Sequence, residues 1–133
     1  MNKRPLYFNR RVLLLMVVVL LGGLASMAKT FNVHGNSVRE VEVLLGGDWA
    51  LHSILSFLLG FIACWATPKY YFRNALFRFP PLLILMLCLV SADEAFQAVS
   101  PLREFSWQDF LINISGLLLG SAVYRLYLAN QSN

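Results

Sequence analysis

Four long apolar runs limit what this 133-residue chain can fold into. They cover residues 12–28, 49–67, 79–99 and 107–128. The hydrocarbon core of a bilayer is about 30 Å thick, and a helix of about 20 apolar residues crosses it. We therefore predict an all-α integral membrane protein, a bundle of four transmembrane helices that forms a single membrane domain over residues 1–133.

The composition indicates a surface that faces lipid. Charged residues make up 14% of the chain and hydrophobic residues 58%, whereas soluble domains contain about 25% charged residues. The net charge of +4 comes from lysines and arginines at the ends of the apolar runs, which favours membrane orientation over nucleic-acid binding. Cys64 and Cys88 lie within apolar runs, so we interpret them as reduced packing residues.

The positions of the basic residues predict that both termini are cytoplasmic. With the N-terminus inside, eight of the 11 lysines and arginines fall on the cytoplasmic side and only Lys29, Arg39 and Arg103 on the outer side. Short loops rich in positive charge stay in the cytoplasm, and every connecting loop agrees with this orientation.

The first apolar run has a second interpretation. A basic start, an apolar stretch and Ser26-Met27-Ala28 also fit a cleaved signal peptide. The stretch is longer than the usual apolar region of such a peptide, which favours a retained span. Cleavage would leave three spans in the same orientation.

We predict a short amphipathic helix in the first outer loop, lying on the outer membrane surface. Ser37 followed by Glu40 matches a capping box. Four apolar residues then share one helical face before Gly46-Gly47: Val38, Val41, Leu44 and Leu45. An irregular loop is the alternative for this segment.

Polar residues inside the predicted spans gather at their outer ends. Such residues are costly in lipid, so their positions are informative. Glu94 and Gln97 are three residues apart and share a helix face, and Asp109 and Asn113, four apart, do the same. We predict that a site in the outer leaflet contains six residues: His52, Glu94, Gln97, Arg103, Asp109 and Asn113.

Several of these residues also have ordinary explanations. His52 alone would be an interfacial histidine, Asp93 a solvated carboxylate at a helix end, and Asp109 an acid that complements the helix dipole. Arg103 beside Glu104 would be an exposed pair of small energetic value. Because the polar groups converge on one level of the membrane, we favour a functional site.

Gly116 and Gly120 continue the face of the last span that carries Asp109 and Asn113. Two small residues four positions apart allow helices to approach closely in a membrane. We therefore predict that both glycines pack against a neighbouring helix.

The order of these residues resembles the VanZ-like family of membrane proteins. That pattern has a histidine on a helix, an E-x-x-Q, an arginine in the following turn, and D-x-x-x-N-x-x-G leading into the last helix. Within residues 48–127 the matching stretches are Leu51-His52, Glu94-Ala-Phe-Gln97, Ser100-Pro-Leu-Arg103 and Asp109-Phe-Leu-Ile-Asn113-Ile-Ser-Gly116, followed by Gly120.

The resemblance implies a small protein of the bacterial inner membrane that is connected with the cell envelope. The namesake of the family is associated with reduced susceptibility to the glycopeptide teicoplanin. Expected partners are membrane lipids, a lipid-linked cell-wall precursor or glycan, or a glycopeptide-related ligand.

The six residues suit such a ligand chemically. The guanidinium of Arg103 suits an anionic phosphate headgroup, and Gln97 and Asn113 would orient the ligand. Three side chains are candidates for catalytic proton transfer: His52, Glu94 and Asp109. Oxygen and imidazole groups also suit a divalent cation such as Mg²⁺, Mn²⁺ or Zn²⁺, and the spacing identifies no particular metal.

Two other functional classes stay open. In a non-catalytic scaffold, the same polar groups would hold the helices together while the outer surface binds a partner. A channel or transporter would need polar residues across the whole membrane, and the inner halves of the spans are apolar. An oligomer could still form a pore that one chain does not reveal.

Overall fold

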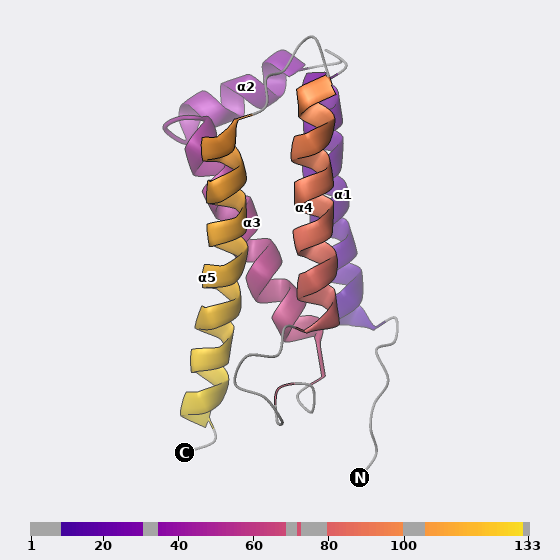
Figure 1. The fold of residues 1–133 in the computed structure, drawn as a ribbon, viewed down its shortest axis with the longest axis vertical. Coiled ribbons are helices and arrows are strands. Elements are labelled where there is room, and N and C mark those ends of the chain that lie inside the picture. The colour runs from indigo at the N-terminus through magenta and orange to yellow at the C-terminus, as the bar shows by residue number, and fades with distance from the viewer. Residues whose placement is uncertain (1–8, 31–34, 69–71, 73–79, 100–105, 132–133) are drawn as a thin grey trace.

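The computed structural model describes residues 9–30, 35–68, 72, 80–99 and 106–131. These ranges form five helices and no strand: α1 (Arg10–Thr30), α2 (Gly35–Leu44), α3 (Asp48–Ala66), α4 (Pro81–Val99) and α5 (Trp107–Gln131) (Figure 1). All except α2 are long and apolar enough to cross a membrane. The predicted all-α architecture with four spans is therefore confirmed for the described residues.

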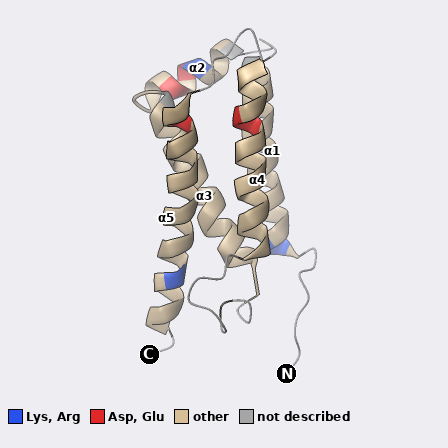
Figure 2. Ribbon diagram, in the orientation of Figure 1, with Lys and Arg blue, Asp and Glu red and all other residues tan. Residues whose placement is uncertain are grey.

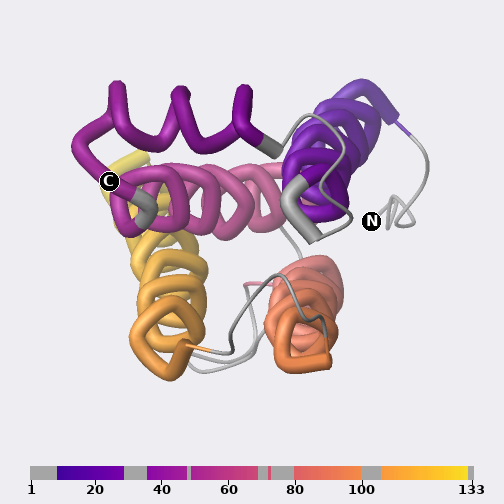
Figure 3. Tube along the Cα trace, turned by 90° about the horizontal axis from the view of Figure 1, so that it is seen from above, coloured from indigo at the N-terminus to yellow at the C-terminus, as the bar shows by residue number. Residues whose placement is uncertain are grey.

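The long helices run alternately up and down. Seen from above, α1, α3, α5 and α4 stand around the bundle in that order, and α2 crosses above one side (Figure 3). Consequently α1 and α4 end, and α3 and α5 begin, at the end of the bundle that carries α2 (Figure 1). We call this the α2 end.

The start of α4 follows from its two prolines. Pro81 occupies the first helical position, where a missing N–H costs nothing. The carbonyl of the preceding Pro80 accepts the N–H of Ile84 at 3.1 Å. The helix therefore begins at residue 81 rather than at the predicted residue 79.

Helix α2 ends at a pair of glycines. The N–H of Gly46 donates to the backbone carbonyl of Val43 at 3.1 Å, and the N–H of Gly47 donates to the backbone carbonyl of Glu42 at 2.8 Å. This is the Schellman pattern, and it requires the positive φ of 101° at Gly46. Ser37 lies inside the first turn rather than at the predicted cap, because α2 already begins at Gly35.

The face that α2 turns toward the bundle is not the apolar face. Glu42 is buried, at 7% exposure, whereas Leu44 is 85% exposed and Val41 and Leu45 are also exposed. The exposed apolar side chains of α2, among them Val41 and Leu44, are thus available to a membrane surface.

Glycines set the close approach of α3 and α5, the most extensive helix contact in the described bundle. A Cβ added to Gly116 would collide with Ser56, and one added to Gly120 would collide with the backbone of Phe57. Gly60, on α3, lies against the backbone of α5 in the same way. Gly116 and Gly120, which we predicted to pack against a neighbouring helix, therefore lie in this contact. Gly60 was not predicted to lie there.

The apolar core lies toward the end opposite α2. It contains Leu15, Ile62, Ala63, Cys64, Ala66, Leu82, Leu83, Met86, Leu117 and Tyr124. Cys64 is a free thiol that donates to Ser121 Oγ at 3.1 Å, whereas Cys88 is free and exposed, so it does not pack as predicted. Figure 2 shows that acidic residues lie toward the α2 end, while basic residues on α1 and α5 lie toward the other end.

Helix α1 is attached to the bundle at both ends. Leu15 is 2% exposed within the core, and Arg11 donates to the carbonyl of Trp65 at 3.1 Å. Its guanidinium also lies 4.7 Å from the centroid of the Trp65 ring, a cation–π contact. Near the α2 end, Ser26 Oγ donates to Asp93 Oδ1 at 2.7 Å.

We predict from these contacts that α1 stays in the mature protein. Cleavage after Ala28 would remove Leu15 from the core and Ser26 from Asp93. Intact-mass spectrometry of membrane-extracted protein should give the full 15.1 kDa. A product that begins at Lys29 would show instead that α1 is a signal peptide.

Candidate functional site

Three side chains that carry a carboxyl or amide group are buried toward the α2 end of the spanning helices α4 and α5. Glu94 is 1% exposed, Gln97 is 2% exposed and Asn113 is 8% exposed. Glu94 and Gln97 come from the last turns of α4, and Asn113 from the second turn of α5. A buried polar group without a partner is costly, so the hydrogen bonds of this region determine what it can do.

Glu94 connects α4 with the start of α5. Its Oε1 accepts the backbone N–H of Ser106 at 3.2 Å. Ser106 in turn caps α5, because its Oγ accepts the N–H of Asp109 at 3.2 Å and its carbonyl accepts that of Phe110 at 3.0 Å. Asp109 therefore sits half-buried in the first turn of α5, next to a cap that Glu94 holds in place.

His52 and Asn113 connect α3 with α5. His52 Nδ1 lies 3.2 Å from Asn113 Oδ1, a hydrogen bond in which the protonated ring nitrogen donates. One turn further along α3, Ser56 Oγ donates to the carbonyl of His52 at 2.6 Å and is buried against Gly116. Ser56 thus forms its hydrogen bond within its own helix.

Asp93 takes part in the same layer, although we interpreted it from the sequence as a solvated carboxylate at a helix end. Its Oδ1 accepts the hydroxyl of Ser26, on α1, and its Oδ2 accepts Gln97 Nε2 at 3.2 Å. The spacing of four residues between Asp93 and Gln97 was a signal that both share a face of α4. No pattern in the sequence pairs Asp93 with Ser26, because that contact depends on α1 lying beside α4.

Hydrogen bonds therefore link all four spans at the α2 end. His52–Asn113 joins α3 to α5, Glu94–Ser106 joins α4 to the start of α5, and Ser26–Asp93 joins α1 to α4. Five of the six predicted residues lie in this layer: His52, Glu94, Gln97, Asp109 and Asn113. Arg103, the sixth, lies outside the described residues.

The predicted divalent cation has no formed ligand set in the described ranges. Among those residues, no group of three histidine, cysteine, aspartate or glutamate side chains comes together as metal ligands do. The layer instead offers carboxylates, an imidazole and two amides, which can hydrogen-bond a polar ligand or transfer protons.

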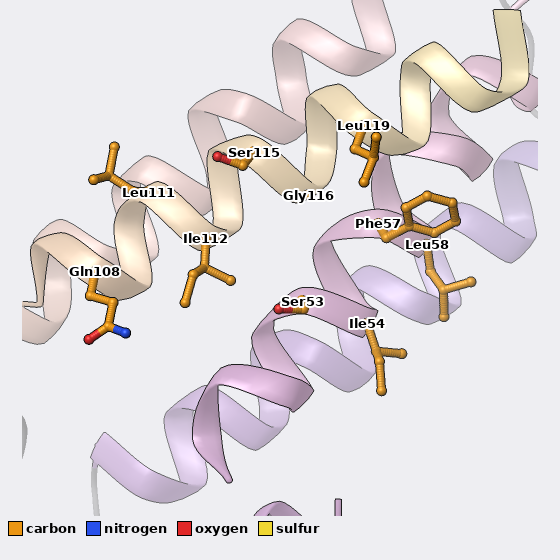
Figure 4. Close-up of a pocket in the computed structure, with 10 residues that line it drawn as sticks. All are labelled: Ser53, Ile54, Phe57, Leu58, Gln108, Leu111, Ile112, Ser115, Gly116 and Leu119. Carbon is orange, nitrogen blue, oxygen red and sulfur yellow. The ribbon is translucent and has the colours of Figure 1, made fainter. Parts of the chain in front are cut away.

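An apolar groove lies beside this layer, between α3 and α5. Its volume is about 880 Å³. Figure 4 shows Ile54, Phe57, Leu111 and Ile112 among its lining side chains, with Gly116 on the α5 side near Phe57. Ser53 directly follows His52 and Ile112 directly precedes Asn113, so the groove adjoins the residues of the α3–α5 hydrogen bond.

Fold and site together define a multi-pass membrane protein with four spans and a buried polar layer at one end. The chain matches the VanZ/LLP1 family model over residues 9–128 and belongs to that family. The match includes the first span, which the motif pattern did not use. No match was found among curated proteins or among solved structures.

Proposed function

We propose that this chain binds an envelope lipid, a lipid-linked glycan or a glycopeptide-related ligand at the α2 end of the bundle. The observation that carries the proposal is the burial of Glu94 and Gln97, at 1% and 2% exposure, within membrane-spanning helices. An ionisable group in such a position is expensive and is retained mainly for function. Family membership supports a role in the cell envelope.

We place the α2 end in the outer leaflet of the bacterial inner membrane. Eight of the 11 basic residues would then be cytoplasmic, which agrees with the positive-inside rule. The exposed apolar side chains of α2, including Leu44 at 85% exposure, would rest on the outer membrane surface. A ligand from the periplasmic side would meet the polar layer first.

The roles of the residues follow from their chemistry. Gln97 and Asn113 carry amides that can orient a polar headgroup by hydrogen bonding. Glu94, Asp109 and His52 can hold or move a proton, so they are the candidates for acid–base chemistry if the bound ligand is also modified. Arg103 would contact an anionic phosphate.

The headgroup assignment predicts that Arg103→Ala loses a phosphate-bearing lipid that the wild type retains. Arg39→Ala is the matched control, because Arg39 is an exposed arginine on α2 that donates to Asn36 Oδ1 of its own helix at 3.4 Å. Native mass spectrometry of the three purified proteins would measure retained lipid. We expect at least a tenfold loss in Arg103→Ala and none in Arg39→Ala. Equal lipid profiles in all three folded proteins would contradict the phosphate site.

A second candidate function is a scaffold whose polar layer holds the helices together. The hydrogen bonds His52–Asn113 and Ser26–Asp93 favour it, because each joins two different spans. Interhelical hydrogen bonds in membranes contribute about 0.6 kcal/mol on average, which is small compared with the cost of burying a carboxyl group there. We therefore rank ligand binding first, and variants of Glu94 distinguish the two functions.

A further inference from the structure

We infer that the groove between α3 and α5 holds one acyl chain of a lipid whose headgroup lies at the α2 end. The inference deepens the proposed function and rests on it for the position of the headgroup. It specifies the ligand as an amphiphile with a hydrocarbon chain rather than a soluble glycan. It also assigns a second surface of α3 and α5, outside the polar layer, to binding.

The groove has the length of one membrane leaflet. Its lining on α5 extends from Gln108 to Leu119, eleven residues apart. At 1.5 Å per residue this is about 16 Å, and one leaflet contributes about half of the 30 Å hydrocarbon core. The groove thus begins at the interface and stops near the middle of the bilayer, where an acyl chain from that leaflet also stops.

Two of the three polar residues that line the groove lie toward its α2 end, as a lipid requires. They are Ser53 and Gln108, where a headgroup or its ester would lie, whereas Ser115 lies deeper. Leu58 and Leu119 line it toward the middle of the membrane. A volume of about 880 Å³ falls within the range of about 300–1,000 Å³ that is typical of sites for small ligands.

The groove lies next to the closest contact between α3 and α5. Contact is closest at Gly116 and Gly120, which approach the backbone and small side chains of α3. Gly116 also lines the groove, beside Phe57 (Figure 4). It is thus part of both the helix contact and the groove lining.

A hydrocarbon chain fits this surface better than a helix from a second copy. Helices associate in membranes through small residues that allow their backbones to approach closely. The rims of the groove carry large side chains instead, with Ile54 at 46% exposure, Leu111 at 60% and Leu119 at 59%. They would hold a second helix away while contacting a flexible chain along its length.

Photo-crosslinking in vesicles tests the inference. The full-length protein is reconstituted in phosphatidylethanolamine and phosphatidylglycerol with a trace of phosphatidylglycerol that carries a diazirine at the middle of one acyl chain. We expect adducts concentrated on residues 53–58 and 111–119. Leu111→Trp, and independently Ile54→Trp, should lower those adducts at least tenfold. Leu126→Trp is the control, because Leu126 is 66% exposed on α5 but lies outside the groove.

Each outcome bears on the inference. Adducts spread evenly over the exposed helix faces, or unchanged in both groove variants, would overturn it. A wild-type dimer that Leu111→Trp dissociates would also overturn it, by showing that a second copy fills the groove. Groove adducts that persist in Arg103→Ala while no variant changes lipid retention would support the groove and refute the proposed headgroup site.

Discussion

Replacing Gly120 with alanine should lower the free energy of unfolding by about 3 kcal/mol, the upper part of the range for overpacking a well-packed interior. A single methyl group at this position would collide with the backbone of Phe57 and of Phe61. Backbone atoms cannot move aside as a flexible side chain can, so α3 and α5 would have to separate. Thermal unfolding in a mild detergent, followed by circular dichroism, would measure the loss.

Gly23→Ala is the matched control for that substitution. Gly23 lies within α1, and a Cβ added there meets no atom within 4 Å. Alanine favours a helix over glycine by about 1 kcal/mol in water, so this variant should be as stable as the wild type or slightly more stable. If Gly120→Ala and Gly23→Ala unfold alike, glycine-mediated contact between α3 and α5 does not stabilise the bundle.

Glu94→Ala should destabilise the protein by about 2–3 kcal/mol, while Glu94→Gln should cost less than about 1 kcal/mol. Alanine leaves a cavity and removes the acceptor of the Ser106 N–H that begins α5. Glutamine fills nearly the same volume and keeps an oxygen that can accept that bond. Unfolding of the two variants beside the wild type would measure the difference.

Glu40→Ala controls for the loss of a carboxylate at this end of the bundle. Glu40 lies exposed on α2, so its removal should change stability by no more than about 0.5 kcal/mol. If Glu94→Gln were as unstable as Glu94→Ala, the carboxyl group itself, and not only its shape, would be needed for folding. That result would favour the scaffold function over a ligand site.

The spans were predictable because each depends on its own segment. An apolar run long enough to cross a bilayer remains a helix whichever neighbours it has, and all four predicted spans lie within three residues of the observed bounds. The choice of Glu94, Gln97 and Asn113 was possible for a similar reason. A polar residue in an apolar run stands out in the sequence before its partner is known.

Features that depend on helix arrangement were not predictable from one sequence. The bond between Ser26 and Asp93 exists because α1 lies beside α4, and no local pattern specifies that neighbour. Gly60 resembles any glycine in a span until α5 is placed against it. The burial of Glu42 was not predicted, because it depends on how α2 packs on the bundle, and no local pattern specifies that packing.

We propose that the buried carboxyl group of Glu94 serves a ligand and not only the fold. Native mass spectrometry of wild-type, Glu94→Gln and Glu40→Gln proteins, purified in the same detergent and checked for equal melting temperatures, tests this proposal. We predict that the wild type and Glu40→Gln retain the same phosphate-bearing lipid and that folded Glu94→Gln loses at least nine-tenths of it. A folded Glu94→Gln protein with the lipid profile of the wild type would contradict the claim and leave the polar layer as a structural network.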